Sequence, residues 1–300
     1  MSQTILRGLS GANPLGFLAV LGLLRLLRRK SDARLGFLSD GSFQPFIEGA
    51  AGDLASLVAD DAASAGKNQT WRLQYNKKEK NGTKVVADLK APPPIFASFL
   101  SACVERWSKG DGEAAAYAAA FGTSIAVDGK GNTKPTAFHF TAANQQFLGT
   151  VEVIRASVTR EWVEHSLFEG HAIRPGYNLR WDPAAERNWA LMANNPNDEG
   201  TGVDAPVEWL AFRGLPLLPS FPRGSRIITT TVSGRSNDMK MIWPLWSASA
   251  SLETVRSVLQ IAWDGSSRDR AMRGVFAVCT SAIRRTSQGF GNFGPATVAS

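Results

Sequence analysis

The sequence is poor in the residues that carry disulfide, metal and nucleophile chemistry. It has two cysteines in 300 residues, Cys103 and Cys279, and neither has a second cysteine at the spacing of a metal site or a redox pair. It has three histidines and no Gly-x-Ser-x-Gly sequence, so nucleophilic catalysis has no recognisable starting point. We therefore predict a cytoplasmic protein with buried, unlinked cysteines, no cofactor and no enzymatic activity.

Long apolar runs are absent as well. The run at 15–27 is shorter than the roughly 20 residues that cross a bilayer as a helix, and Arg25 interrupts it. Three basic residues follow it at 28–30 without a small-residue cleavage site, which is the reverse of the charge order in a secretory signal. The sequence therefore predicts no membrane segment.

Motifs of enzymes are incomplete. Residues 289–294 spell Gly-x-Gly-x-x-Gly, but a dinucleotide site needs this pattern at the start of a helix within a βαβ unit, and only six residues follow. Glu161 and His165 are four residues apart and could present two metal ligands on one helical face, which keeps a metal-dependent nuclease as a minor alternative. The adjacent carboxylates Asp60 and Asp61 are interpreted as solvated.

The sequence does have an excess of basic residues, and three segments contain it. The net charge is +7 at pH 7 and the pI is near 9.6. Residues 1–31 have five basic residues and no acidic one, residues 67–90 have seven against two, and residues 270–300 have four and none. If folding gathers these segments on one face, they favour a polyanionic partner such as nucleic acid. Three unrelated solvated surfaces are the alternative.

The first half of the sequence predicts helices and short strands. Asn13 can cap and Pro14 can start a helix that is apolar on nearly all sides and ends in basic residues near position 30. Residues 76–82 are predicted to be the tip of a basic β-hairpin. Further helices are predicted at 53–65, 95–107 and 113–121, and strands at 34–37, 42–47 and 136–140.

The second half predicts one long helix or two consecutive helices at 144–165. The other predicted elements are a helix near 204–214, strands at 225–232 and 239–243, and helices at 251–262 and 268–283. Because the order of types is irregular, we predict an α+β fold, mostly helical with small antiparallel sheets. A soft boundary separates an N-terminal α+β region with the basic hairpin, 1–145, from a C-terminal α+β region, 146–300, and the two can also form one domain.

Tryptophan and arginine recur together along the chain. Arg180 precedes Trp181, Arg72 follows Trp71, and residues 243–246 read Trp-Pro-Leu-Trp. Arginine binds phosphate with a planar fork, and aromatic faces accept unstacked bases or the arginine itself. These segments indicate a binding protein, although most tryptophans of globular proteins pack in the core.

Seven short stretches resemble, in order along the chain, the type I-G (formerly I-U) CRISPR-associated proteins. The resemblance is to the small family described as an extension of the CRISPR helicase-nuclease and related to the large subunit of Cascade. It leaves residues 67–90 and the last six residues uncovered, and the chain is short for a large subunit. The stretches are residues 6–22, 136–140, 145–148, 179–183, 187–191, 215–219 and 243–246.

The resemblance implies a noncatalytic subunit of a crRNA-guided interference complex in antiviral defence. A large subunit of this kind reads the protospacer-adjacent motif (PAM), holds the displaced strand and helps to recruit the helicase-nuclease. The implied partners are target DNA, crRNA, other Cascade subunits and the helicase-nuclease, without a membrane. The alternative is an adaptor that docks the helicase-nuclease and does not itself bind DNA.

Eleven residues are predicted to bind nucleic acid, most of them because they are basic. Gln145 and Asn292 are included as possible readers of base edges, and Arg180 because it adjoins a tryptophan. The full set is Arg25, Arg28, Arg29, Lys77, Lys78, Lys80, Gln145, Arg180, Arg284, Arg285 and Asn292.

Overall fold

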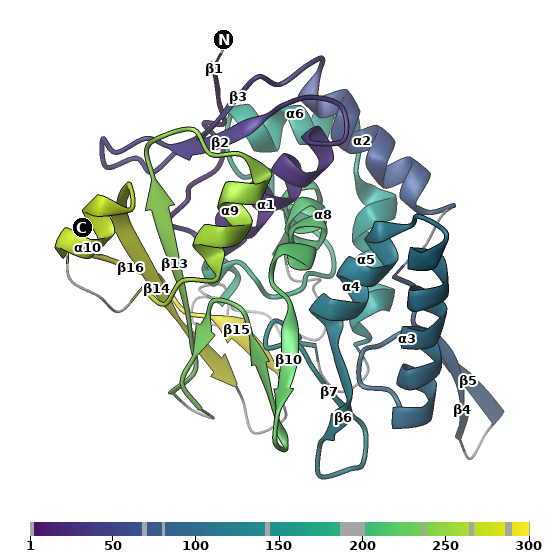
Figure 1. The fold of residues 1–300 in the computed structure, drawn as a ribbon. Helices are drawn as coiled ribbons and strands as arrows, with labels where there is room; N and C mark the ends of the chain where they lie inside the picture. Colours follow the sequence, from purple (N-terminus) through teal and green to yellow (C-terminus); the bar gives the residue numbers. More distant parts are fainter. Residues whose placement is uncertain are drawn as a thin grey trace, which may run out of the picture.

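The computed structural model has an α+β fold in which helices surround two central helices and small antiparallel sheets cover the rest (Figure 1). The predicted fold class is confirmed. The structure describes residues 3–67, 71–79, 82–141, 145–186, 202–235, 238–263, 267–285 and 290–299.

The central helices are α1 (Pro14–Leu27) and α8 (Ala205–Gly214), which pack directly on each other. The Asn13 side chain accepts hydrogen bonds from the amides of Leu15 and Gly16, so the predicted cap and start of α1 are confirmed. All fourteen residues of α1 are buried. A Cβ atom built on Gly22 would lie 1.8 Å from the Leu210 carbonyl oxygen, so only glycine permits this close approach of the two backbones.

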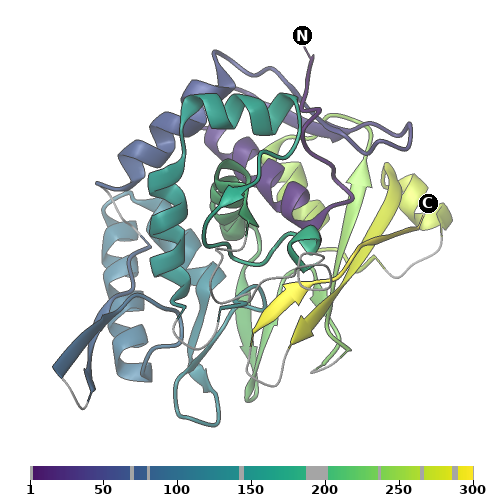
Figure 2. The same ribbon diagram turned by 180° about the vertical axis from the view of Figure 1, so that it is seen from behind.

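Five further helices lie on one side of this pair, and Figure 2 shows α5 and α6 at the back of the molecule. Of the two alternatives predicted for 144–165, two consecutive helices is the correct one: these are α5 and α6, with Thr159 capping the second. The five helices are α2 (Leu54–Ala65), α3 (Pro93–Ser108), α4 (Gly112–Phe121), α5 (Phe147–Ser157) and α6 (Arg160–Phe168).

The largest sheet lies on the other side and has the order β12-β13-β14-β15, with β16 also paired to β14. Short helices α9 (Leu252–Leu259) and α10 (Ser267–Met272) connect β13 to β14. The helix predicted at 268–283 is wrong, because that segment is α10 followed by the long strand β14. The strands are β12 (Val232–Ser233), β13 (Lys240–Trp246), β14 (Val275–Arg285), β15 (Gly291–Phe293) and β16 (Thr297–Ala299).

The remaining sheets have two or three antiparallel strands each. β1 (Gln3–Ile5), β3 (Pro45–Glu48) and β2 (Arg34–Phe37) form one sheet, and β4 (Tyr75–Glu79) with β5 (Gly82–Val86) forms the predicted hairpin. The strand predicted at 136–140 is wrong, because β7 ends at Pro135 and the chain turns there. The other pairs are β6 (Gly122–Val127) with β7 (Thr133–Pro135), β8 (Arg174–Pro175) with β9 (Gly202–Val203), and β10 (Ser220–Arg223) with β11 (Arg226–Thr229).

The main hydrophobic core contains residues from Leu6 to Phe293 in sequence, and a smaller cluster contains Trp263, Val275 and Val278. Both cysteines are buried as predicted, and burial raises the pKa of Cys103 to about 11 and that of Cys279 to about 12. Within the described residues, no helix combines the length and apolar character that crossing a membrane requires.

Most tryptophans of the aromatic segments belong to this core. Trp181, Trp209, Trp243 and Trp246 are buried, and each donates its indole N–H to a protein oxygen. They are therefore packing residues with satisfied hydrogen bonds and not exposed stacking platforms. Trp189 lies outside the described residues.

Candidate nucleic-acid interface

Arg180 is held in a fixed position by the segment around it. The Asn178 side chain accepts a hydrogen bond from the Arg180 amide (3.1 Å), and the Leu179 amide donates to the Glu208 carboxyl on α8 (3.3 Å). The Trp181 indole N–H donates to the carbonyl of Phe138 (2.8 Å). Arg180 has a φ of 62°, a left-handed conformation that is uncommon for a residue with a side chain. The surrounding contacts thus fix an unusual backbone geometry at this arginine.

The Arg180 guanidinium lies over the ring of Phe290, with its central carbon 4.4 Å from the ring centre. This geometry is typical of a cation–π interaction. Arg180 is half-buried and burial lowers its pKa, yet a guanidinium keeps its charge at neutral pH. The Phe290 ring orients the guanidinium of Arg180. Because the ring has no net charge, it does not neutralise the positive charge of the arginine.

Arg284, Arg285 and Asn292 lie on the two strands next to Phe290. β14 and β15 pair so that Arg284 is opposite Asn292 and Arg285 is opposite Gly291. The Arg285 guanidinium donates to the carbonyl oxygens of His139 (3.2 Å) and Ala137 (3.0 Å). Successive strand residues point to opposite faces of a sheet, so Arg284 shares a face with Asn292 and Arg285 lies on the other. We call the group Arg180, Arg284, Phe290 and Asn292 the Arg180 surface.

A buried pair lies behind the backbone segment that Arg285 binds. His139 Nε2 is 2.9 Å from a carboxylate oxygen of Asp88, and the other oxygen of Asp88 accepts from the Phe147 amide (2.7 Å). Burial lowers the pKa of Lys90, with Arg285 acting in the same direction and Asp88 against it. These contacts tie residues near 88, 139 and 285 together beneath the Arg180 surface.

Gln145 is half-buried directly before α5. Its side-chain oxygen is buried and has no hydrogen-bond partner among the described residues. The neighbouring Gln146 accepts a hydrogen bond from the Ala87 amide (2.6 Å). The structure thus places Gln145 beside the segment that contains Asp88 but does not place it in contact with Arg180.

The hairpin residues Lys77 and Lys78 are exposed on β4. Lys77 is directly opposite Lys84 on β5, so like charges face each other across the hairpin. The hairpin projects from the edge of the molecule beside α3, away from β15 in both views (Figures 1 and 2). Lys80 lies outside the described residues. The hairpin and the Arg180 surface are therefore two separate basic regions.

The basic residues at the end of α1 are engaged with carboxylates. Arg25 is only 7% exposed and its guanidinium binds Glu113 (2.7 Å) and the Arg213 carbonyl oxygen. Arg29 binds the same Glu113 carboxylate (2.5 Å), and Arg28 is 3.6 Å from both Asp32 and Glu253. Arg25 is thus a buried structural residue, and we leave it out of the candidate interface because nucleic acid could not reach it.

Sequence reasoning missed the buried ion network to which Arg25 belongs. Arg213 on α8 binds Asp61 (3.0 Å) and Glu113 (3.4 Å) and donates to the Tyr117 hydroxyl (3.0 Å). Its guanidinium also lies over the rings of Trp71, Trp209 and Tyr117. Burial raises the pKa of Asp61, with Arg213 opposing that effect. The prediction that Asp61 is solvated is wrong. No feature of the sequence indicates that this residue contacts α8.

The ligand pair proposed for a metal is on the surface of α6. His165 is half-exposed and its Nε2 is 3.4 Å from a carboxylate oxygen of Glu169. Across the described residues, no three His, Cys, Asp or Glu side chains are grouped in a way that could hold a metal ion.

Comparison with known proteins found no family model that matches this chain and no curated protein that matches it.

Proposed function

We propose that this chain is a noncatalytic nucleic-acid-binding subunit of a type I CRISPR interference complex, and that it binds through the Arg180 surface. The observation that carries the proposal is the Arg180 guanidinium held over Phe290, the residue directly before β15, on which Asn292 is opposite Arg284. In this role the subunit contributes to binding of target DNA and its PAM and to recruitment of the helicase-nuclease.

The chemistry of the Arg180 surface supports this proposal. No carboxylate of the described residues forms an ion pair with Arg180 or Arg285, in contrast to Arg25, Arg28 and Arg29. A phosphate can therefore become the counterion of the Arg180 guanidinium without breaking an ion pair, whereas the Arg285 guanidinium already donates to the carbonyls of His139 and Ala137. The Asn292 carboxamide donates one hydrogen bond to the Phe293 carbonyl (3.3 Å), and its second N–H and its oxygen are the kind of donor and acceptor pair that recognises adenine edges.

The hairpin supplies a second, nonspecific contribution in this proposal. Its lysines are compact charges on a projecting element, which suits contact with a backbone rather than reading of bases. Changing Lys77 and Lys78 to alanine should weaken binding equally for all sequences and make its salt dependence less steep.

The direct test is fluorescence-anisotropy binding of the purified protein to single-stranded DNA, duplex DNA and RNA over a salt series. Arg180→Ala should weaken binding about tenfold and reduce the salt slope by roughly 0.7 for a single strand, because one phosphate contact is lost. The matched control is Arg256→Ala, which removes an equal charge from the exposed side of α9. If Arg180→Ala and Arg256→Ala have equal effects, the Arg180 surface is not the interface.

A protein adaptor is the second candidate, and one observation favours it. Val104 and Trp107 on α3 are 59% and 60% exposed and lie one helical turn apart. Exposed tryptophan with a neighbouring aliphatic residue is typical of an interface anchor. If the chain is an adaptor, Trp107→Ala should abolish co-purification with the helicase-nuclease, while Arg180→Ala should leave it unchanged.

A further inference from the structure

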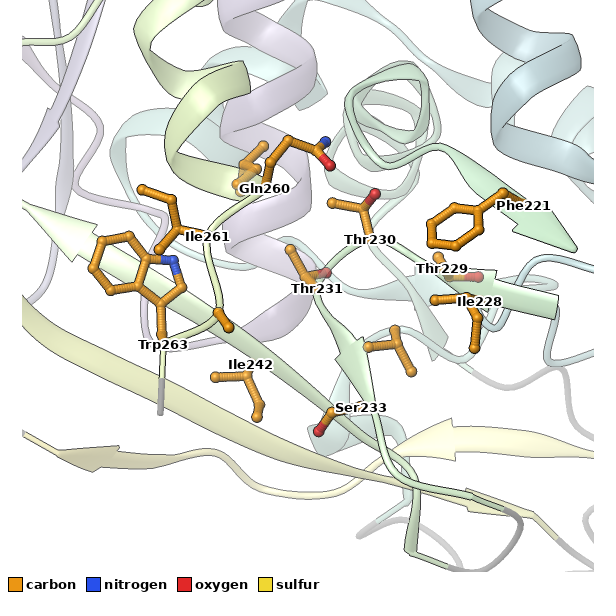
Figure 3. Close-up of a pocket in the computed structure, with 13 residues that line it drawn as sticks. Phe221, Ile228, Thr229, Thr230, Thr231, Ser233, Ile242, Gln260, Ile261 and Trp263 are labelled. Carbon is orange, nitrogen blue, oxygen red and sulfur yellow. The ribbon is translucent and has the colours of Figure 1, made fainter. Parts of the chain in front are cut away.

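A cavity of about 330 Å³ opens between the β10–β11 hairpin, the start of β12 and the loop that follows α9 (Figure 3). Phe221 lies on one side of it in this view, and Ile261 lies on the other. None of the described residues that line the cavity is charged. The volume is at the lower end of the range of ligand sites, about 300–1,000 Å³, so the cavity suits a small apolar group.

The apolar walls keep accessible surface, so a group that enters the cavity can touch them. Phe221 is 49% exposed. Gln260 is also exposed, and its carboxamide offers a donor and an acceptor to the backbone of a bound segment. Covering apolar surface of this kind is favourable. Four aliphatic side chains of the lining are half-buried: Ile228, Val232, Ile242 and Ile261.

Two arginines lie on the same face of the β10–β11 hairpin as two of these apolar residues. Side chains two positions apart on a strand point to the same face, so Arg223 shares the face of Phe221. Arg226 is directly opposite Arg223, just as Ile228 is opposite Phe221. Both arginines are exposed, and no carboxylate of the described residues forms an ion pair with either of them. Two cations without an internal counterion therefore lie beside the apolar cavity.

A third cation lies at the turn between these two arginines. The Lys134 ammonium on the neighbouring β6–β7 hairpin donates to the Ser225 carbonyl (2.7 Å). The acidic residue of that hairpin, Asp128, instead accepts hydrogen bonds from two amides of its own loop. Like charges directly opposite each other on antiparallel strands are destabilising. A carboxylate from outside would relieve the repulsion at this turn and form charge-assisted hydrogen bonds with the arginines.

We propose that this face binds an acidic segment of a partner protein, with a bulky apolar side chain in the cavity and a carboxylate on Arg223 and Arg226. The charge of the segment complements that of the turn, which selects the partner and its orientation. Positions 221 and 223 are about 7 Å apart along the strand. An extended segment therefore needs its acidic residue about two positions from the apolar anchor, and a helical segment about four.

A strand of nucleic acid fits this face less well. Its phosphates could bind the arginines, but the polar edges of its bases would meet aliphatic side chains that cannot form hydrogen bonds with them. Among the described residues of the lining, Phe221 has the one exposed aromatic ring, whereas a bound single strand stacks successive bases on several rings. Aliphatic walls favour an aliphatic or aromatic side chain as the group in the cavity.

The proposal does not depend on the function proposed for the Arg180 surface. The cavity adjoins β12, one edge of the largest sheet, whereas the Arg180 surface adjoins β15 at the other end of the strand order. Arg180→Ala should therefore leave peptide binding at the cavity unchanged. The two sites can fail or succeed independently in experiments.

The test is selection of short peptides from a display library by the full chain, followed by fluorescence-anisotropy binding of the selected peptides. Each peptide has a central Leu, Ile, Met or Phe, with Asp or Glu at varied distances from it. One matched library has Asn and Gln in place of the acidic residues, and another has Ser in place of the central residue. We expect binders from the first library alone. No binder at millimolar concentration, or equal enrichment from a matched library, would overturn the proposal.

Two substitutions test the charge and the cavity separately. Arg223→Gln should weaken binding of the selected peptide about tenfold and make it less sensitive to salt. Ala262 is exposed and lines the cavity, so Ala262→Phe should obstruct the cavity and also weaken binding about tenfold. The matched control is Arg7→Gln, which removes the same charge from an exposed residue outside the lining and should leave the affinity unchanged. Equal affinities of Arg223→Gln and Arg7→Gln, or full binding by Ala262→Phe, would refute the proposal.

Thermal unfolding separates binding from folding. Because Arg223 faces Arg226, Arg223→Gln removes a repulsion and should unfold at the same or a higher temperature than the wild type. Its peptide affinity should nevertheless fall. A lower unfolding temperature together with the lost affinity would indicate a structural role for Arg223 and would contradict the proposal.

Other occupants of this face are distinguished by two further measurements. A single-stranded oligonucleotide should not displace the selected peptide, and displacement from both the wild type and Arg180→Ala would assign the face to nucleic acid instead. Sedimentation of the protein alone should show no self-association through this face. Dimers that Ala262→Phe abolishes would assign the face to a second copy of this chain, and either result would overturn the proposal.

Discussion

Two arginines of this protein lie against aromatic rings, and their surroundings differ in one decisive respect. Arg213 is 3% exposed, lies over three rings and is paired with the carboxylates of Asp61 and Glu113. Arg180 lies over Phe290, and no carboxylate of the described residues pairs with it. Proximity of arginine and aromatic residues therefore does not by itself identify a binding surface. The presence or absence of an internal counterion distinguishes a structural cation from one that can bind an external anion.

The largest effect on stability is expected at Arg213, because its guanidinium is buried. Arg213→Ala leaves the buried Asp61 carboxylate without its counterion and removes one of the three arginines that pair with Glu113, so the free energy of unfolding should fall by about 3–5 kcal/mol. Urea denaturation followed by circular dichroism measures this change. Arg29→Ala is the matched control, because Arg29 binds the same Glu113 but is 47% exposed. This substitution should lower the free energy of unfolding by less than about 1 kcal/mol. Similar losses in both variants would contradict the distinction between enclosed and exposed pairs.

An intermediate effect on stability is expected at Glu208, which connects the helix of Arg213 to the segment of Arg180. It lies on α8, like Arg213, and accepts the amide of Leu179 next to Arg180. Burial raises its pKa to about 8, with a smaller contribution from Asp182 in the same direction, so the carboxyl is protonated at neutral pH.

The sign of the resulting pH dependence follows from proton binding. Below pH 4.5 both the folded and the unfolded chain keep this proton, and between pH 4.5 and about 8 only the folded chain keeps it. Stability should therefore decrease as the pH rises across this interval, by on the order of 1 kcal/mol per pH unit from Glu208. Glu208→Gln cannot titrate and should flatten the dependence in urea titrations at several pH values. A slope unchanged by Glu208→Gln would show that other groups cause it.

The smallest effect is expected in the hairpin, where cations face each other across two strands. Lys84→Glu places an opposite charge beside Lys77, so hydrogen exchange of the hairpin amides should slow by the equivalent of less than about 1 kcal/mol. The gain should disappear at high salt because the pair is exposed. Lys84→Gln removes one charge without adding another, so it should slow hydrogen exchange in the hairpin by part of the amount expected for Lys84→Glu. Faster hydrogen exchange in Lys84→Glu at low salt would mean that repulsion between Lys77 and Lys84 does not limit the stability of the hairpin.

Local signals in the sequence were sufficient for the elements that depend on neighbouring residues. Asn13 and Pro14 located the start of α1, because a cap and a proline act within one helical turn. The helix predicted at 268–283 is instead a strand from Val275 onward. Its pairing with β13 and β16 decides in favour of a strand, and that pairing involves residues far away in sequence.

The site could be predicted only in part, for the same reason. Arg25 and Arg28 look alike in sequence, yet Arg25 binds Glu113, which is 88 positions away, and is buried with it. Arg285 reaches the His139 carbonyl across 146 positions, which no local pattern encodes. Composition identified the basic segments, whereas the choice between internal pairing and surface exposure depends on the tertiary contacts.

Helix α1 has a consequence for the synthesis of this protein. All its fourteen residues are buried, so it has no polar side to present to water before its neighbours exist. Its contact with α8 joins residues 188 positions apart, as in the hydrogen bond from Arg25 to Arg213. At about 5–20 residues per second, a ribosome needs roughly 10–40 seconds to add that length. During this time the nascent chain carries an uncovered apolar helix, so the period before α8 emerges is when a chaperone matters most for its yield.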